Sequence, residues 1–301
     1  YDVASQPPQI YTDGPYVGLY GSKEMRYKIG EDGDWEEYVC PIAIDHTENV
    51  SVYAAYAGKE TSSAQKDFAA DFSQYVGPYS VTAVDASVSF NGVQFDLART
   101  YLPGIGWFQS VDTKLTRTND NILTVTMPDG TARAFEKDKQ NGNIYKNILT
   151  GYTISVYNDN EETVYALQMD GVVYGYDQNG RLAYIADEED HRITISRTDS
   201  EIRFSYGTGA EARAYVLALS GGKIQSVTTP MGEKIVYSYA NGRLTKVQYE
   251  ESTLQVKRED GIILHEYAYS GGVLTEDNGS VITYDLSLIH ISEPTRLLSI
   301  S

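Results

Sequence analysis

The sequence has few of the residues on which most cross-linked and catalytic sites depend. Among 301 residues it contains one cysteine and four histidines. A single cysteine excludes an internal disulfide, and Cys40 lies in a strand-like run, where we expect a small buried apolar side chain. No apolar run approaches the roughly 18 residues that a membrane-spanning helix needs. The sequence therefore gives no sign of a membrane span.

Basic residues are also scarce, with 24 Lys and Arg against 42 Asp and Glu, which gives a formal net charge of −18. This charge argues against nucleic acid and anionic membrane surfaces as partners, and we interpret it as a source of solubility. The chain begins at Tyr1 rather than Met, so we expect the natural N-terminus to lie upstream. The absence of a visible signal peptide therefore does not indicate a compartment.

Phenylalanine is scarce at 7 residues, whereas tyrosine and glycine reach 26 each. Tyrosine-rich sequence interrupted by glycine is typical of β-strands joined by tight turns. The clearest example is the segment 174–187. Tyr174 and Tyr176 share one face of an extended chain, residues 177–180 have turn chemistry, and alternation resumes from Leu182. The segment predicts a β-hairpin.

The hairpin pattern recurs along the second half of the chain. Residues 237–247 repeat it with a shorter turn, 221–227 repeat its second half, and 267–274 form a looser copy. The turn glycines Gly180, Gly222, Gly242 and Gly272 are 42, 20 and 30 residues apart. A period near 20 or 21 residues fits the first two intervals, and the third is irregular. Such a period indicates a repeat architecture with one hairpin per unit.

These repeats resemble the YD-repeat, or Rhs, family, whose unit is Tyr-x-Tyr-Asp-x-x-Gly-Arg-Leu followed by a Pro-x-Gly or similar turn. Residues 176–182 match the unit fully, and residues 229–239 match the second turn and strand. The resemblance identifies as structural repeat positions Tyr174, Tyr176, Asp177, Gly180, Arg181, Leu182, Tyr237, Tyr239, Gly242, Arg243, Leu244, Tyr267 and Tyr269.

The segment before the repeats, 79–150, contains two hairpin signals, Asn91-Gly92 and residues 128–130. It also resembles the entry segment that precedes the repeats in Rhs proteins, where an Arg-x-Tyr strand, Gly-x-Gly-Trp, and Asp-Gly followed by Phe occur in this order. The positions that carry the resemblance are Arg99, Tyr101, Gly106, Trp107, Asp129, Gly130 and Phe135. The repeats themselves are expected from 151 to 285.

The first 60 residues predict a small β-sandwich over 10–60, after a linker at 1–9. Residues 27–56 resemble bacterial Ig-like modules of surface proteins, which act as spacers or sugar-facing stalk domains. We expect a linker over 61–78. Within it, the four-residue spacing of Ala64, Phe68 and Phe72 also allows a short helix.

The last 16 residues, 286–301, have a different character. Residues 286–296 resemble the translation of a transposon-based sequencing adapter, so we exclude 286–301 from fold reasoning as a non-native tail. We expect the natural chain to continue past Asp285.

Candidate chemistry is sparse. Asp45 and His46 are adjacent in a strand-like run and face opposite ways, and no Gly-x-Ser-x-Gly motif occurs. The acidic clusters 187–191 and 30–34 could bind Ca²⁺, but they lack the spacing of a twelve-residue calcium loop and are better interpreted as solvated turns. We therefore expect no enzyme, catalytic residue, metal or cofactor.

The repeat tyrosines allow two interpretations, sugar stacking or packing across neighbouring strands, of which we favour packing. Arg181 and Arg243 follow the turn glycine in both good copies, and we expect them to pair with turn carboxylates.

Together these features predict an all-β protein in which an Ig-like sandwich precedes an antiparallel hairpin array. The resemblance implies that the array coils into a hollow shell, which in complete Rhs proteins encloses a C-terminal toxic domain. We expect a non-catalytic segment of a secreted or cell-surface bacterial protein, whose partners are the remaining repeats and C-terminal domain of its own polypeptide. The alternative is a surface adhesin segment that binds carbohydrate or another cell through the Ig-like module and the tyrosine-rich repeats.

Overall fold

The computed structural model describes residues 6–46, 48–70, 81–102, 105–159, 162–250, 263–271 and 273–282. These residues form antiparallel β-sheets with only short 3₁₀ turns between them, which confirms the all-β prediction. Within the described ranges no helix is long and apolar enough to cross a membrane. Gly104, Gly272 and the tail 286–301 lie outside the described residues.

The N-terminal part contains two small sheets. One has the order β1-β2-β5, with β1 (Gln9–Asp13), β2 (Tyr16–Tyr20) and β5 (Ile42–Ala43). The other has the order β4-β3-β6-β7, with β4 (Glu36–Glu37), β3 (Met25–Ile29), β6 (Val50–Tyr56) and β7 (Ala64–Phe68). Val17, Ile44 and Val52 form their shared core.

Two expectations for this region are wrong. Residues 64–68 are neither a helix nor a linker, because they form β7 and pair with β6 from Val50↔Phe68 to Ala54↔Ala64. Phe72 lies outside the described residues. Cys40 is exposed rather than buried, since the expected strand contracts to Ile42–Ala43 and leaves the cysteine in the preceding bend.

A second three-stranded sheet, the inner sheet, consists of β8 (Val81–Phe90), β9 (Val93–Leu102) and β10 (Gly106–Gln109). The Asn91-Gly92 turn joins β8 to β9 as predicted. Both turn residues have positive φ, 48° and 92°, which asparagine and glycine tolerate best. The inner sheet is followed by a short 3₁₀ turn, η4 (Ser110–Asp112).

The remaining strands form one 17-stranded antiparallel sheet, in which every strand pairs with its sequence neighbours. Its strands are β11 (Lys114–Arg117), β12 (Ile122–Thr126), β13 (Ala132–Lys137), β14 (Ile144–Lys146), β15 (Thr153–Asp159), β16 (Glu162–Met169), β17 (Val172–Tyr176), β18 (Leu182–Ala186), β19 (Arg192–Arg197), β20 (Glu201–Tyr206), β21 (Arg213–Ser220), β22 (Lys223–Thr228), β23 (Lys234–Ala240), β24 (Arg243–Tyr249), β25 (Ile263–Ser270), β26 (Val273–Asp277) and β27 (Ser280–Val281). The expected start of the repeats at Gly151 is therefore not a sheet boundary, because β11–β14 belong to the same sheet.

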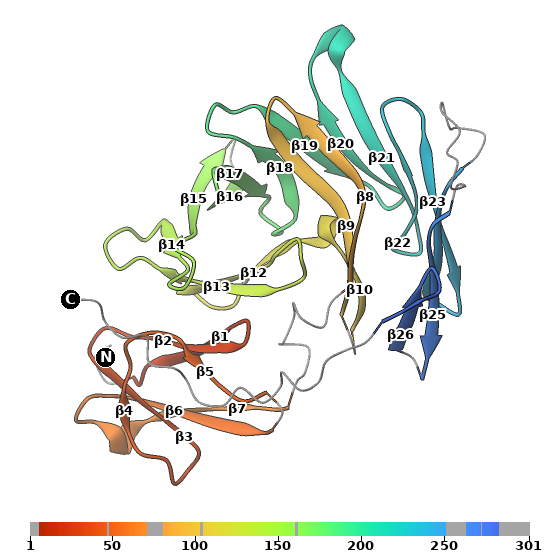
Figure 1. Ribbon diagram of the computed structural model, residues 1–301. Coiled ribbons are helices and arrows are strands. Elements are labelled where there is room, and N and C mark those ends of the chain that lie inside the picture. Colours follow the sequence, from red (N-terminus) through yellow and green to blue (C-terminus); the bar gives the residue numbers. More distant parts are fainter. Residues whose placement is uncertain are drawn as a thin grey trace, which may run out of the picture.

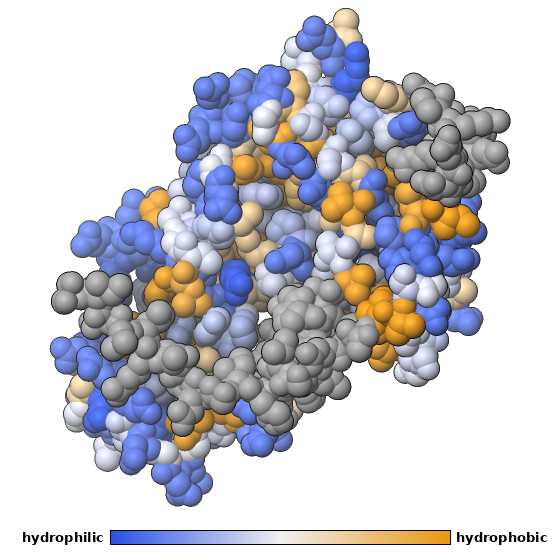
Figure 2. Space-filling model, in the orientation of Figure 1, coloured by the Kyte–Doolittle hydropathy of each residue, from blue (hydrophilic) through white to orange (hydrophobic). Residues whose placement is uncertain are grey.

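The large sheet curls around the inner sheet (Figure 1). One continuous core joins them, with Phe95 and Leu97 of β9 packed among residues from β11 to β26, such as Leu217 and Leu274. Phe95 stacks on Phe204 of β20 at a centroid distance of 5.5 Å. Hydrophilic residues cover much of the outer rim of the molecule in the same view (Figure 2). The packing of Phe95 and Leu97 shows that the inner sheet fills the curled sheet over this part of its length.

The hairpins β17–β18, β21–β22, β23–β24 and β25–β26 share one register, whereas β19–β20 pairs without a bulge. A β-bulge precedes the second tyrosine in three of these hairpins, at Gly175/Tyr176, Ser238/Tyr239 and Ala268/Tyr269, and each of these tyrosines pairs with the leucine after the turn. The hairpin β21–β22 has the same bulge with Leu219 opposite Ile224. The 42-residue interval between turn glycines spans a hairpin without glycine, β19–β20, so the period near 21 continues through it.

The N-terminal sheets dock on the large sheet through a buried carboxylate. Asp13 of β1 accepts hydrogen bonds from the Ala134 backbone and the Asn147 side chain, both at 2.8 Å. Burial raises the pKa of Asp13, and these two hydrogen bonds partly offset that rise. Beside them Tyr11 donates to Glu136 at 2.5 Å.

A buried polar network as the candidate functional site

Arg99 is the largest fully buried side chain among the described residues, with none of its surface exposed. The Asp85 carboxylate receives two hydrogen bonds from it, from Nε and from one terminal nitrogen, both at 2.7 Å. Asp85 reaches this position because a β-bulge between Val84 and Ala86 interrupts the pairing of β8 with β9. The inner sheet therefore carries a buried bidentate ion pair on the side that faces the repeats.

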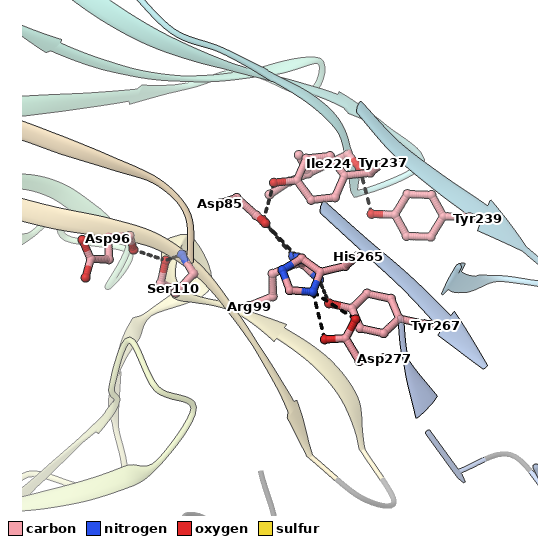
Figure 3. Close-up of polar contacts among 11 residues, drawn as sticks. Asp85, Asp96, Arg99, Ser110, Ile224, Tyr237, Tyr239, His265, Tyr267 and Asp277 are labelled. Carbon is pink, nitrogen blue, oxygen red and sulfur yellow. Dashed lines mark hydrogen bonds and ion pairs between the residues drawn. The ribbon is translucent and has the colours of Figure 1, made fainter. Parts of the chain in front are cut away.

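Two repeat tyrosines complete this network (Figure 3). Tyr237 of β23 donates its hydroxyl to Asp85 at 2.5 Å, and Tyr267 of β25 accepts a hydrogen bond from the second terminal nitrogen of Arg99. The guanidinium carbon lies 5.4 Å from the centroid of the Tyr267 ring and 5.2 Å from that of Trp107. All three guanidinium nitrogens thus have partners: two bind Asp85, and the third binds the Tyr267 hydroxyl.

The charges of this network shift the pKa values of its members. Burial alone would lower the pKa of Arg99, but the hydrogen bond and charge of Asp85 reverse the effect and hold that pKa above its ordinary value. Burial, and then Asp85, raise the pKa of Tyr237 well above 10. Burial likewise raises the pKa of Tyr267, although Arg99 opposes the rise. Arg99 therefore stays charged and both tyrosines stay neutral over the physiological range.

The second tyrosine of the last two repeats joins neighbouring hairpins. Tyr239 donates to the Ile224 carbonyl at 2.8 Å, and Tyr269 donates to the Leu244 carbonyl at 2.5 Å. Ile224 and Leu244 both occupy the position after the turn in the preceding hairpin. Each tyrosine hydroxyl thus binds one backbone oxygen of the unit before it. In the hairpins β23–β24 and β25–β26, the first tyrosine of the motif Tyr-x-Tyr meets the inner sheet and the second joins two repeats.

The predicted entry residues lie around the same network. Trp107 of β10 donates to the Tyr269 hydroxyl at 2.9 Å, and the Tyr101 hydroxyl accepts the Leu274 backbone N–H at 3.1 Å. Gly106 has a φ of 106° at the start of β10. The structure therefore brings Arg99, Tyr101 and Trp107 together with the last two pairs of repeat tyrosines.

The remaining entry residues are structural. Asp129 forms the turn between β12 and β13 by accepting the Thr131 N–H at 2.8 Å, and Gly130 has a φ of 86° there. Phe135 of β13 is completely buried in the main core.

The first repeat meets other partners. Tyr176 is completely buried and its hydroxyl lies 2.9 Å from that of Thr113, while Tyr174 packs edge to face on Phe95. Asp177 builds the turn by accepting the N–H groups of Asn179 and Arg181. Leu182, like Leu244, is buried.

Two expectations for charged residues have clear outcomes. In the described part of the chain neither Arg181 nor Arg243 forms an ion pair within 4.0 Å, so the expected pairing with turn carboxylates is wrong; Arg243 lies over the Tyr269 ring at 5.7 Å instead. The acidic turn 187–191 is organised by Asp187, which accepts the N–H groups of Glu189 and His191 and approaches His191 Nδ1 at 2.7 Å. Asp187 raises the pKa of His191, and His191 lowers the pKa of Asp187.

The other two histidines among the described residues also have neighbours. His46 is buried with Nε2 3.0 Å from the Pro15 carbonyl. His265 stacks on Tyr267 at 5.7 Å and its Nδ1 lies 2.9 Å from Asp277 (Figure 3). Among the described residues no group of three or more His, Cys, Asp or Glu side chains could hold a metal ion.

Sequence reasoning missed Asp85 and the pair His265 and Asp277. Asp85 had one signal, an acid between Val84 and Ala86 in a strand that alternates elsewhere, but nothing in the sequence joined it to Arg99. Chemically, the network binds one sheet to another through charge and hydrogen bonds, since its donors and acceptors are used within the protein.

Compared with known proteins, the chain matches no family model and no curated protein sequence.

Proposed function

We propose that this chain is a non-catalytic structural segment of a secreted or cell-surface bacterial protein of the Rhs, or YD-repeat, type. Its repeats would form part of a β-shell that encloses a C-terminal toxin domain. The inner sheet would close one end of that shell from within, and the N-terminal module would act as a spacer. The role is mechanical, because the segment would enclose a volume and would not catalyse a reaction.

One observation carries this proposal, namely the attachment of the inner sheet to the concave side of the curled sheet. Asp85 and Arg99 bind Tyr237 and Tyr267, which belong to different repeats more than 130 residues further along the chain. A wall that is bound from inside at successive repeats keeps its curvature. The inner sheet then supports the curve and fills the end of the shell that it closes.

Limited proteolysis of the full natural protein tests this function. We expect the domain that follows the repeats to resist a protease that degrades the same domain when it is expressed alone. Arg99→Met, which breaks the attachment of the inner sheet, should shorten that protection. Equal digestion of the enclosed and isolated domain would reject containment.

One observation supports the alternative function as an adhesin. On the outer face of β3 and β6, Lys28 lies 4.8 Å from the Tyr53 ring and 5.8 Å from the Trp35 ring, and both rings are partly exposed. The repeat tyrosines of the Asp85 network give it no support, because Tyr237 and Tyr267 are buried. A glycan array probed with this chain separates the two functions, since binding that is lost in Trp35→Ala would favour adhesion.

A further inference from the structure

One edge of the large sheet carries a cation at each of four successive hairpins. Arg181 begins the return of β17–β18, Arg197 ends β19, Lys223 begins β22 and Arg243 begins β24. These positions flank the turns of four consecutive hairpins on the same edge. Lys223 and Arg243 begin strands two apart, whereas Arg197 lies on β19, one strand from β18 and three from β22. Since neighbouring strands lie about 4.8 Å apart, the row from β18 to β24 extends over about 29 Å of sheet. The protein as a whole has a net charge of −18, so this row runs against its overall charge.

The four cations line two adjoining cavities that we call the edge groove. One cavity, of about 540 Å³, is lined by Arg197, Lys223 and Arg243. The other, of about 670 Å³, is lined by Arg181 and Arg197. Both cavities share the wall of Val111, Asp112, Arg197, Ile202, Leu219 and Gly222, so they form one continuous groove beside η4.

The edge groove has more positive than negative side chains in its lining. Asp112 and Asp199 are the acids that line it, and Lys114 adds a fifth cation. Within the described ranges none of Arg181, Arg197, Lys223 and Arg243 has a carboxylate within 4.0 Å. Lys223 donates to the Gly242 carbonyl at 2.6 Å and lies over the Tyr239 ring, so its charge is not neutralised by these contacts.

Arg197 provides a second, independent observation. One of its terminal nitrogens donates to the Val111 carbonyl, but its Nε is buried and has no hydrogen-bond partner among the described residues. A buried guanidinium nitrogen without a partner is costly, because it loses its hydration and gains nothing in return. An acceptor bound in the groove would remove that cost.

The spacing and lining select the chemistry of the occupant. A single small anion cannot bridge a row that extends over about 29 Å, whereas an extended polypeptide of about nine residues covers that length. Trp107, Tyr239 and Tyr269 line the same cavity as Lys223 and Arg243 and offer apolar surface for side chains between the acids. We propose that the edge groove binds an acidic segment of polypeptide in extended form, with its carboxylates on the row of repeat cations. This inference rests on the proposed containment role, since such a segment would belong to the enclosed domain.

The test uses the whole chain and a fluorescein-labelled oligoglutamate of about 12 residues, long enough to span the row at about 3.3 Å per residue. The groove variant combines Arg181→Gln, Lys223→Gln and Arg243→Gln, all at exposed positions. The matched control combines Lys23→Gln, Arg203→Gln and Arg213→Gln, which are also exposed, do not line the groove and remove the same charge. Circular dichroism and thermal unfolding confirm that both variants fold.

We expect the peptide to bind the unmodified chain, with an affinity that falls at least tenfold in the groove variant, changes less than about twofold in the control, and weakens with added salt. Three results would overturn the inference: no binding by the unmodified chain, equal loss in both variants, or displacement of the peptide by inorganic phosphate or a sulfated oligosaccharide as readily as by unlabelled oligoglutamate. The proteolysis experiment on containment does not depend on this affinity, so the two ideas can fail separately.

Discussion

Two turn glycines show how much a repeat position depends on its surroundings. Gly180 and Gly222 have the same φ of 73°. A Cβ on Gly180 would lie 1.8 Å from the Leu115 carbonyl oxygen, whereas a Cβ on Gly222 would meet nothing within 4 Å. The contact at Gly180 arises because Leu115 of β11 donates its N–H to the Gly180 carbonyl at 2.8 Å, where the first strand of the curl meets the first repeat.

We therefore expect Gly222→Ala to destabilise the protein by about 1–2 kcal/mol, which is the cost of a left-handed alanine. Gly180→Ala should cost about 2–3 kcal/mol more, because β11 must also move. Urea unfolding of the two variants measures the difference. Equal losses would mean that β11 does not press on this turn.

Arg99 and Asp85 form the other residue-scale feature with a large expected effect. Arg99→Met should lower the free energy of unfolding by about 3–5 kcal/mol, since it leaves Asp85 buried without its charge partner. Adding Asp85→Leu should recover part of the loss, because the uncompensated carboxylate is then gone. The exposed pair of Arg203 and Glu201, at 2.9 Å, is the control, and Arg203→Met should cost less than about 1 kcal/mol. A small loss in Arg99→Met would show that the network contributes little to the attachment.

At the scale of the element, the repeat is a hairpin with a fixed bulge and a tyrosine that reaches the previous hairpin. The bulge sets which residues face inward, so Tyr239 and Tyr269 pair with Leu244 and Leu274 and their hydroxyls reach one unit back. In the unit β21–β22, Leu219 takes the place of this tyrosine and the bulge is kept. In the unit β19–β20, Arg197 takes that place and pairs with Ile202 without a bulge. A repeat such as β21–β22 can thus lose the hydrogen bond and keep the register, because the bulge and the buried leucine or isoleucine remain.

Removing either hydroxyl tests this ladder. Tyr239→Phe and Tyr269→Phe should each destabilise the protein by about 1 kcal/mol, since each leaves a half-buried carbonyl without its donor. Tyr157→Phe is the control, because among the described residues the Tyr157 hydroxyl meets only the Tyr184 hydroxyl, at an exposed position. Chemical denaturation of the three variants gives the values. A ladder that contributes nothing would leave all three alike.

At the scale of the whole molecule, the curl places many tyrosines between two sheets, and their burial has a consequence at high pH. Burial raises the pKa of Tyr239 to about 12, and it raises those of Tyr237 and Tyr267 as well. In the unfolded chain the same groups titrate near pH 10. Above that pH the unfolded state loses protons that the folded state retains, so the free energy of unfolding must fall as the pH rises.

We accordingly expect stability to be independent of these tyrosines below about pH 9 and to decline between about pH 10 and 12. Urea unfolding across that range, together with the ultraviolet absorbance of tyrosinate, follows both the stability and the ionisation. The triple variant Tyr237→Phe, Tyr239→Phe and Tyr267→Phe should show a shallower decline. Full ionisation of all tyrosines near pH 10 with the fold intact would contradict the packed interior.

The sequence alone determined the strands and turns, because their causes are local. Alternation of side chains sets which segments are extended, and Asn91-Gly92 and Asp177 to Gly180 have the backbone freedom and side-chain hydrogen bonds that tight turns require. The recurring hairpin pattern likewise located the tyrosine pairs, whereas Arg99 and Trp107 were identified through a resemblance in the order of motifs.

The tertiary structure alone decided what those residues meet. Asp85 reaches Arg99 through a bulge, and both meet Tyr237 and Tyr267 only because the sheet curls back over the inner sheet. It also decided that Cys40 is exposed, that residues 64–68 complete a sheet, and that the repeat cations line one groove. Each of these depends on strand order and sheet curvature, which arise from contacts between residues far apart in the chain, and a periodic pattern carries no information about such contacts.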